Sequence, residues 1–403
     1  MKFLGLEISR SKKPAASIPL NDLSGYGLPS VSGAYVTENR VMGLTAHFAC
    51  VRLIATTLAS LPIHIYERTE TGKKKRNNHP AARLLREAPN SEMTAYSFIE
   101  ALQAQLSNRG KAFAEIVHDR KGNIEALLPI PVNSVQPRRK DKFSPVEYHF
   151  TETGTILPAW KILHIPGLGF DGINSFSPIQ LFRQTFGLGM AVEEFGARFF
   201  SNGTNIGGIL EHPGKLSDEA IERLKTSTKV QYEGLRRSHG LMVLEEGMKY
   251  TKIAMPLEDI QFIESRKFTA TEIARIHGVP PHLIGDLEKA TFSNIEEQGL
   301  EAVIYLFRSW AVRWEQAFNN KLFSENERGK YYIKFELDGL LRGNMKDRYT
   351  AYATGMQNGF LNADEVREKE DMNPLPNGAG QIYRFPLNMS QNEKKIKSQG
   401  EVT

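Results

Sequence analysis

The segment that decides the fold is ESRKFTATEIARIHGVPPHLIGDLEKATFSNIEEQ, residues 264–298. Its first half reads as a helix that meets the sequence GVPP at residues 278–281. Because proline lacks a backbone N–H and forces the preceding residue out of the α region, the helix must end there. Ser293, with Glu296 three residues later, predicts a capping box that begins a second helix. The segment therefore predicts two fixed helix ends around a polar loop.

Composition limits the class of protein but does not decide it. A chain of 403 residues with 40% hydrophobic residues is long enough for about two or three cores. Its single cysteine, Cys50, excludes an internal disulfide framework and favours a reducing compartment. The N-terminal sequence lacks the pattern of a secretory signal, and no apolar run reaches the roughly 20 residues of a membrane span. We therefore expect a chain that is soluble and intracellular when it is made.

The charge pattern permits a nucleic-acid partner without requiring one. The formal net charge is +5, and basic runs occur at Lys73–Arg76, Arg138–Lys140 and Arg236–Arg237. Since most such runs are solvated surface, charge alone leaves the function open.

Residues 41–170 have the pattern of one α+β domain built on an antiparallel sheet. The preceding residues 1–40 are rich in Ser, Gly, Pro and Asn without periodicity, which predicts a flexible arm. The first helix is expected to bury Phe48, Val51, Ile54 and Leu58, which recur every three or four positions. Helices are predicted at Leu44–Ser60, Pro80–Arg86 and Thr94–Asn108, a turn at Thr69–Asn78, and strands at Ile63–Arg68, Ala112–His118, Ile124–Leu128, Val146–Phe150 and Ile162–Ile165.

A pair of helices with a small module between them follows. Ser177 as N-cap and Pro178 at the first helical position begin a helix that can run to residue 202. Gly187 and Gly189 each cost about 1 kcal/mol against alanine in an exposed helix. Either another backbone packs closely there, or the helix is kinked. The module, residues 206–255, combines short strands with a helix capped at Ser217, and a helix at 259–277 returns from it.

The long helix after the polar loop has the clearest periodicity of the chain. Its apolar stripe is Leu300, Val303, Ile304, Phe307, Ala311, Trp314, Phe318 and Leu322. A strand is predicted at Tyr331–Leu337, and helices at Met345–Gln357 and Ala363–Asp371, the last capped by Asn362 and Glu365. The tail beyond Pro386 is polar and rich in lysine, which predicts disorder.

The sequence patterns that resemble enzyme motifs do not meet the requirements of those motifs. The glycines of a G-x-G-x-x-G pattern, Gly167, Gly169 and Gly172, follow a predicted strand, but the next helix begins only at Pro178. A dinucleotide site needs the third glycine to open that helix, so we interpret this pattern as a turn. The segment 208–215 differs from a phosphate-binding loop in spacing, and Leu216 stands where such a loop has Ser or Thr. Histidines occur singly and the sequence has no cysteine pair, so we expect no metal site, no cofactor and no enzymatic activity.

Several stretches together resemble the portal proteins of tailed bacteriophages of the HK97 family. They are HFACVRLIATTLASLPIHIYER, HPAARLLREAPN, FIEALQAQLSNRGKAFAEIVHDRKGNIEALLPI, ILHIPGLGFDGINSFSPI, FFSNGTNIGGIL, LEEGMKY, IARIHGVPPHLIG and NGFLNADEVREKEDMNPLP. Each is weak alone, but their number and order are specific, and they extend from about Leu44 to Pro386.

The resemblance implies the α+β portal fold, with an antiparallel-sheet wing, a helical-hairpin stem, a small α/β clip, a long spine helix and a short helical crown. By order of elements it assigns 1–40 to the arm, 41–175 to the wing, 177–202 and 258–278 to the stem helices, 203–257 to the clip, 279–293 to the tunnel loop, 294–325 to the spine helix, 326–343 to a strand returning to the wing, 344–385 to the crown and 386–403 to the tail.

The resemblance also implies a function and partners. Portal proteins of this family form a ring, of twelve subunits in the mature head, at one capsid vertex. The ring is the channel through which double-stranded DNA is packaged and ejected, without sequence readout. It binds the large terminase subunit, the head–tail connector and the major capsid protein or scaffold, not a membrane. This implies a virion protein that is present in the host cytoplasm during assembly.

Two groups of residues are candidates for contacts with these partners. In the tunnel loop, Lys289 is offset by Asp286 and Glu288, while Phe292 is a candidate packing anchor at the loop's end. On the clip, the candidate docking surface consists of Arg236, Arg237, Glu245 and Glu246.

Two other classes of protein are weighed against the portal. A nucleic-acid-processing enzyme would need a metal or phosphate site, and no motif for one survives inspection. A monomeric adaptor module would not explain two firm helix ends around a polar loop.

Overall fold

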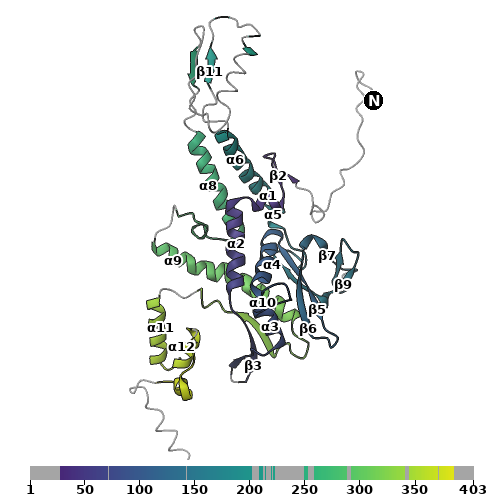
Figure 1. The fold of residues 1–403 in the computed structure, drawn as a ribbon, viewed down its shortest axis with the longest axis vertical. Coiled ribbons are helices and arrows are strands. Elements are labelled where there is room, and N and C mark those ends of the chain that lie inside the picture. Colours follow the sequence, from purple (N-terminus) through teal and green to yellow (C-terminus); the bar gives the residue numbers. More distant parts are fainter. Residues whose placement is uncertain are drawn as a thin grey trace, which may run out of the picture. The chain divides into compact units, whose positions relative to one another are not determined.

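A computed structural model describes residues 28–70, 72–141, 143–201, 208–211, 214, 219, 221–222, 249–252, 258–287, 292–340, 345–370 and 372–384 (Figure 1). The chain divides into two compact units, Met1–Glu336 and Leu337–Thr403. Helices and antiparallel strands are mixed along it, which confirms the predicted α+β class.

Among the described residues of the N-terminal unit, the helices are α1 (Glu38–Met42), α2 (Thr45–Ser60), α3 (Pro80–Arg86), α4 (Ala95–Arg109), α5 (Pro178–Leu181), α6 (Arg183–Ser201), α8 (Glu258–His277), α9 (Phe292–Glu301) and α10 (Arg308–Lys321). Short 3-10 turns are η1 (Val132–Ser134), η2 (Ala159–Lys161) and η3 (Pro281–Ile284), and η4 (Ala302–Phe307) is a π-helical turn. The strands are β1 (Leu28–Pro29), β2 (Tyr35–Val36), β3 (Ile63–Thr69), β4 (Gly72–Lys75), β5 (Lys111–His118), β6 (Ile124–Ile130), β7 (Val135–Arg138), β8 (Glu147–Phe150), β9 (Ile156–Pro158), β10 (Ile162–Pro166), β11 (Gly208–Glu211), β12 (Lys249–Lys252) and β13 (Tyr331–Phe335).

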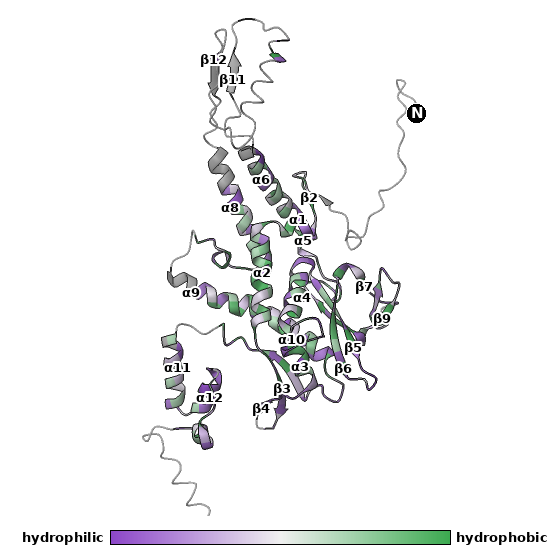
Figure 2. Cartoon of the chain, viewed as in Figure 1, coloured by the Kyte–Doolittle hydropathy of each residue, from purple (hydrophilic) through white to green (hydrophobic). Residues whose placement is uncertain are grey.

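Helix α2 packs against α4 and α8, and hydrophobic residues recur along the helix (Figure 2). Three of the four residues predicted on its apolar face are buried: Val51, Ile54 and Leu58. The fourth, Phe48, is 45% exposed, so this part of the prediction is wrong. His47 and Cys50 occupy the buried positions of the first turns instead.

The strands form several small antiparallel sheets rather than the single sheet predicted for residues 41–170. Three of these sheets have the strand orders β13-β3-β4, β10-β5-β6 and β7-β8-β9. The first of them includes β13, which lies more than 250 residues after β3 and pairs Phe335 with Ile63. The sequence of short strands separated by turns does not show how many sheets the strands form. A pairing between residues so far apart in the chain cannot be predicted from the local sequence. Tyr148 of β8 packs against Phe113 of β5, which joins two of the sheets through one hydrophobic cluster.

The basic run that begins at Lys73 was predicted to lie in a turn, and that prediction is wrong. Lys73, Lys74 and Lys75 form strand β4, which pairs with β3 at the edge of its sheet. Lysines are common on such edges because their charge discourages further strand pairing. Lys73 also lies over the ring of Tyr66, with its Nζ 4.8 Å from the ring centroid.

Helix α5 has the N-cap predicted at Ser177, and close packing is the one of the two alternatives for the glycines of α6 that the structure shows. The Ser177 side chain accepts a hydrogen bond from the Gln180 N–H, as an N-cap does. The predicted single helix is interrupted at Phe182, whose ψ of 27° ends α5 before α6 begins. A Cβ placed on Gly187 would lie 2.3 Å from Ser30, and one on Gly189 would lie 2.9 Å from the Thr269 side chain. Both glycines therefore allow neighbouring segments to pack closely against α6.

The long helix after the polar loop contains a π-helical turn that the stripe did not predict. Val303 and the members of the stripe from Phe307 to Leu322 are buried as expected, but Leu300 and Ile304 are 45% and 48% exposed. Ala302 and Leu306 are buried in their place. A π turn inserts about one extra residue, which rotates the apolar face between α9 and α10.

The C-terminal unit contains α11 (Met345–Gln357), α12 (Ala363–Lys369) and η5 (Pro376–Gln381). Asn362 and Glu365 form the predicted capping box at the start of α12. The Arg348 guanidinium binds Glu370 across the two helices, at 2.9 Å from Nε to Oε1, and the Tyr352 hydroxyl donates to the same carboxylate. These contacts hold α11 and α12 together.

Candidate functional site

The polar loop between α8 and α9 starts from a tightly fixed helix end. Gly278 follows α8 with a φ of +66°, which favours glycine. The Val279 N–H donates to the carbonyl of Ala274 at 2.9 Å, and the Val279 side chain is 3% exposed. The turn η3 follows directly and ends at Gly285, whose φ is +94°. The first half of the loop is therefore folded onto the helix end, as the sequence GVPP predicts.

A buried histidine pair holds this helix end against the rest of the unit. His277, the last residue of α8, donates from Nε2 to Nδ1 of His47 on α2 at 3.0 Å. His47 in turn contacts Oδ1 of Asn108 on α4 through its Nε2 at 2.7 Å. Because the Asn108 oxygen can only accept, His47 carries a proton on Nε2. While His47 is neutral, its Nδ1 has no proton and accepts from Nε2 of His277. If His47 were protonated, its Nδ1–H would face Nε2 of His277, which would have to give up its own proton.

The electrostatics of the pair agree with its geometry. Burial, with a smaller contribution from His47, lowers the pKa of His277 to about 3. Burial also lowers the pKa of His47, partly offset by its bond to Asn108. Both rings thus take up protons more readily in the unfolded chain, whose histidine pKa is near 6.5.

We expect acid to weaken the fold through this pair. Below about pH 6.5 the histidines of the unfolded chain bind protons, whereas the two buried rings of the folded chain stay neutral. As the pH falls, each ring therefore lowers the free energy of unfolding by about 1.4 kcal/mol per pH unit, until the pH reaches its folded pKa. His277→Gln, which keeps a side-chain donor, should remove part of that slope between pH 6.5 and pH 5. Urea titrations at several pH values measure it, with His149→Gln, a partly exposed ring on β8, as the matched control. Equal slopes in wild type and His277→Gln would contradict the prediction.

Of the predicted site residues, the structure describes Asp286 and the backbone of Phe292. Asp286 lies in the described part of the loop, just after Gly285. Glu288 and Lys289 lie outside the described residues, as do Arg236, Arg237, Glu245 and Glu246 on the insert between α6 and α8.

The far end of the loop differs from the prediction. Phe292 is the first residue of α9, and its side chain is outside the described set. Ser293 therefore lies inside the first turn of α9, and its prediction as the N-cap is wrong. The helix begins earlier than the capping-box spacing indicates.

The glycines of the G-x-G-x-x-G pattern build a loop, as interpreted from the sequence. The Gly167 N–H donates to the carbonyl of Gly110 at 2.6 Å, and the Asp171 carboxylate accepts from the N–H groups of Ile173 and Asn174. A Cβ on Gly169 would lie 1.9 Å from the Asn174 carbonyl oxygen. The glycines are thus required by the turn itself, and no helix begins at Gly172 to bind a phosphate.

Among the described residues, no group of three His, Cys, Asp or Glu side chains is placed to hold a metal ion. Burial raises the pKa of the Cys50 thiol to about 12, so it is a poor nucleophile. Among the described helices, none is long and apolar enough to cross a membrane.

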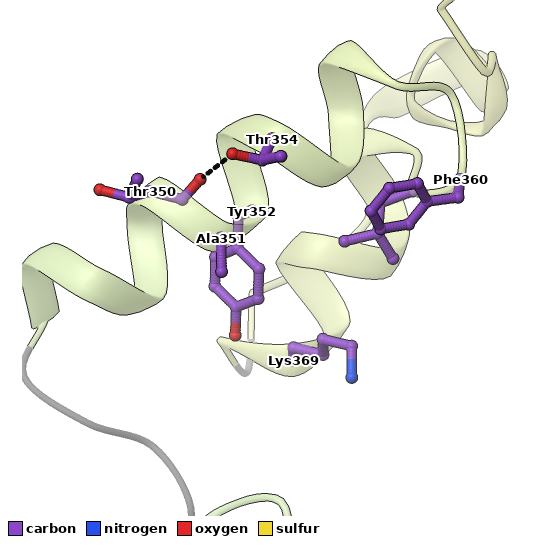
Figure 3. Close-up of a pocket in the computed structure, with 7 residues that line it drawn as sticks. Thr350, Ala351, Tyr352, Thr354, Phe360 and Lys369 are labelled. Carbon is purple, nitrogen blue, oxygen red and sulfur yellow. Dashed lines mark hydrogen bonds between the residues drawn. The ribbon is translucent and has the colours of Figure 1, made fainter.

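A groove of about 720 Å³ lies on the C-terminal unit (Figure 3). It is lined by Thr350, Ala351, Tyr352, Thr354, Phe360, Leu361 and Lys369. The Thr354 hydroxyl donates to the Thr350 carbonyl, and the Lys369 Nζ lies 3.7 Å from an Asp338 oxygen. The lining offers an open apolar surface with one cation, without a general base or nucleophile pair.

Sequence reasoning missed the histidine pair that anchors the loop. The sequence shows its histidines singly, and the partner of His277 lies 230 residues earlier in the chain. The local signal was the pattern of α2, in which His47 occupies a buried position among apolar residues.

The comparisons with known proteins agree with one another. The family model described as phage portal protein matches residues 45–371. The chain belongs to the phage portal protein family. Its sequence is 34% identical to the probable portal protein of Streptomyces phage phiC31, over 92% of this chain and 84% of that protein. It is 31% identical to the portal protein of Enterobacteria phage HK97, over 85% of this chain and 82% of that protein.

Solved structures show the portal fold as well. The chain matches the HK97-family phage portal protein of Corynebacterium diphtheriae with a TM-score of 0.56 and 18% identity, over 76% of this chain and 96% of that one. A chain of the neck of an empty gene transfer agent particle, computed with C6 symmetry, matches with a TM-score of 0.61 and 24% identity, over 87% and 97%. The neck of the native particle, computed with C12 symmetry, matches with a TM-score of 0.57 and 22% identity over the same shares. These matches confirm the predicted portal fold.

Proposed function

We propose that this portal protein assembles into a ring of twelve copies at one vertex of a phage capsid, and that double-stranded DNA enters and leaves the head through the ring. The observation that carries the proposal is the family match over residues 45–371, together with a fold shared with particle necks of C12 and C6 symmetry. The protein would then be part of the virion and would occupy the host cytoplasm during assembly.

The proposed role is structural rather than catalytic. This proposal rests on family membership and on the hydrogen bond of His277, which fixes the end of α8 where the polar loop begins. A fixed helix end of this kind is suited to positioning a loop rather than to reacting with a substrate. The partners we propose are the large terminase subunit, the head–tail connector and the major capsid protein or scaffold.

We assign the parts of the portal to elements of the chain. Residues 41–175 would form the wing, which β13 would rejoin by pairing with β3. Helices α6 and α8 would form the stem, with the clip at 203–257 between them. The tunnel loop would be 279–293, followed by the spine in α9, η4 and α10, and the C-terminal unit would hold the crown.

Ring assembly is tested by the mass of the particle. Native mass spectrometry and negative-stain images of the purified chain should show closed rings, including forms with other subunit numbers after overexpression. Only single copies at high protein concentration would contradict the proposal and would favour a monomeric adaptor module.

The tunnel loop offers little net charge to DNA. In a ring every loop charge is repeated in each copy, and Asp286 and Glu288 outweigh Lys289 by one negative charge in each. A loop without net attraction for DNA suits a channel in which DNA slides, because many strong phosphate contacts would raise affinity steeply. No recognition helix is predicted in the loop, so we propose no sequence readout.

We expect loop variants to affect DNA movement rather than assembly. Lys289→Ala, and separately a shortened loop, should leave rings and proheads intact because the loop's anchors at Val279 and His277 are untouched. Packaging rate and final DNA content of filled heads should change. Lys140→Ala, in the basic run after β7, is the matched loss of one positive charge away from the loop. Kinetics and DNA content equal to wild type in both loop variants would remove the loop from the mechanism.

The clip charges are a second proposed contact. Arg236 and Arg237 with Glu245 and Glu246 are proposed to dock the terminase or the tail connector. Reversing both arginines to glutamate should leave rings intact and weaken binding to one of these partners, measured by pull-down on assembled rings. The alternative is that the charges only solvate the surface, and unchanged binding of both partners would favour it.

A further inference from the structure

The outer face of the β13-β3-β4 sheet carries positive charge on all three strands. The register places Arg68 of β3 opposite Lys73 of β4, and Lys334 of β13 opposite His64 of β3. Cross-strand partners and every second residue of a strand share one face of a sheet, so these side chains point the same way. Ile333 of the opposite face is buried in the core, whereas Arg68, Lys73 and Lys334 are exposed. We call these three cations the basic face; its strand β4 is hydrophilic in Figure 2.

The charges of the basic face are not neutralised by the sheet itself. Arg68 and Lys73 are directly opposite each other, and like charges in such a pair destabilise a sheet. The three strands contain one carboxylate, Glu67, which belongs to the opposite face and binds Arg76 and Lys330. Within the part of the chain that the structure describes, no ion pair is formed by a cation of the basic face. An anion from outside the chain would remove this repulsion.

The surroundings of the basic face are positive as well. Lys75 and Arg86 lie close enough to His64 to lower its pKa, in addition to the larger effect of burial. Two carboxylates border the face: Glu336 contacts the His64 ring at 3.0 Å, and Glu70 follows β3. The three cations of the basic face together with Lys75 and Arg86 outnumber these two carboxylates.

Protection of the sheet edges explains only part of this pattern. Lysines on β4 discourage the pairing of a further strand, because β4 is an edge strand. Arg68, however, is on the central strand. The outer edge of β13 is already covered, since Glu315 and Asn319 of α10 accept hydrogen bonds from the N–H groups of β13. Neither Arg68 nor Lys334 is therefore needed to block an edge.

Two tyrosines hold cations of the basic face in place. Tyr66 and Tyr332 are cross-strand partners whose ring centroids stack 5.4 Å apart. The Arg68 guanidinium lies over Tyr332, with Cζ 5.2 Å from the ring centroid. The Lys73 ammonium lies over Tyr66 at 4.8 Å. A cation that is already held on a ring loses less freedom when it binds an anion. Because Tyr66 is only 8% exposed, the rings offer little surface on which a base of a single strand would stack.

The composition of the basic face favours a nucleic acid over a protein as the partner. Protein interfaces are centred on apolar and aromatic anchors, whereas protein–DNA interfaces are more polar and much more positively charged. Among the described residues, none of the large hydrophobic side chains that are exposed belongs to β3, β4 or β13. The face thus offers charge without an apolar anchor.

We propose that the basic face of the β13-β3-β4 sheet binds the phosphate backbone of double-stranded DNA, at a site separate from the channel and without sequence readout. The choice of duplex DNA as the ligand rests on the proposed function, which brings DNA to this protein. Exposed cations on a sheet surface reach phosphates, and phosphate contacts carry no sequence information. The tunnel loop has no net attraction for DNA, so the basic face would be where the protein retains it.

Binding of a short fluorescent duplex, followed by anisotropy at several salt concentrations, tests the proposal. Arg68→Gln with Lys73→Gln should lower the affinity at low salt by about tenfold or more, and the slope of log K against log salt should fall by about two, one for each lost phosphate contact. Arg120→Gln with Lys121→Gln, which removes the same two residue types from the exposed turn between β5 and β6, is the matched control and should bind as wild type. Lys334→Gln should lower the slope by about one.

A charge-preserving variant separates charge from packing. Arg68→Lys with Lys73→Arg should keep most of the affinity, and a loss as large as in the glutamine pair would assign the effect to packing on the tyrosines and overturn the proposal. Wild-type affinity and slope in the glutamine pair would also overturn it. If polyglutamate displaced the duplex as well as unlabelled DNA of equal charge does, the partner would be an acidic protein segment instead.

Closed circular DNA separates the basic face from the channel. Such DNA cannot thread a closed ring, so it reaches only surfaces outside the channel. Rings should bind it, and the glutamine pair should bind it more weakly. Rings that bind the linear duplex but not the circle would overturn a separate site. If the purified chain formed no ring, the ring proposal would fail alone, because single copies that bind the duplex and lose affinity in the glutamine pair would still support the basic face.

Discussion

Trp314→Ala should lower the free energy of unfolding by about 3–5 kcal/mol, the usual cost of removing a fully buried large aromatic side chain. Trp314 on α10 is 0% exposed, and its Nε1–H donates to Oε1 of Gln103 on α4 at 2.8 Å. Gln103 is also 0% exposed and contacts Ser107 through its Nε2 at 3.2 Å. The variant would therefore leave both a cavity and a buried amide oxygen without its donor. Urea denaturation followed by circular dichroism measures the loss.

Trp160→Ala is the matched control for that change. Trp160 is 57% exposed and lies beside Lys161, whose Nζ is 5.3 Å from the ring centroid. Losing this exposed contact should cost about 1 kcal/mol or less. Similar losses in the two variants would show that α10 is not held by its buried tryptophan. Trp314→Phe separates the two causes, because it keeps most of the packing and removes only the hydrogen bond.

The features that sequence predicted well are those written in neighbouring residues. Ser177 and Asn362 cap helices as expected, since a cap depends on the side chain and the next three residues. The end of α8 at Gly278 follows equally from the local sequence GVPP. Ser293 shows the limit of the same rule, because a capping-box spacing does not exclude a helix that begins two residues earlier, at Phe292.

The features that sequence missed depend on distant contacts. The π turn at η4 buries Ala302 and Leu306. The predicted stripe assumed uniform helical spacing, so it could not include these two positions. Lys73–Lys75 form a strand only because β3 is beside them. The histidine pair joins residues 230 positions apart, so neither histidine alone differs from an ordinary structural one.

Of the polar loop, the sequence predicted the first end and not the second. The first end follows from prolines and glycine, whose effect on the backbone is intrinsic. Which loop charges would meet DNA depends on the neighbouring copies of the proposed ring, and a single chain carries no such contacts. The proposed roles of Lys289 and the clip arginines therefore stay predictions from charge and order.

Gly110→Ala should be the most damaging substitution among the glycines that the structure describes in the N-terminal unit, with an expected loss of about 3 kcal/mol or more. Gly110 ends α4 with a φ of +73°, a conformation that costs an L-residue about 1–2 kcal/mol. A Cβ there would also lie 1.9 Å from the Phe176 carbonyl oxygen, which is backbone and cannot rotate away. Either the chain at Phe176 moves or α4 unwinds at its end.

Gly122→Ala separates the two costs. Gly122 has a φ of +84° but open space around the position of a Cβ, so it should lose only the conformational part, about 1–2 kcal/mol. The difference between the variants measures the clash with Phe176. Because α5 begins two residues after Phe176 and leads into α6, Gly110→Ala should also reduce the ring fraction, while Gly122→Ala should not. If both variants lost the same stability and both kept full ring formation, the contact between Gly110 and Phe176 would be free to move. The contact would then not be what positions α5 and α6.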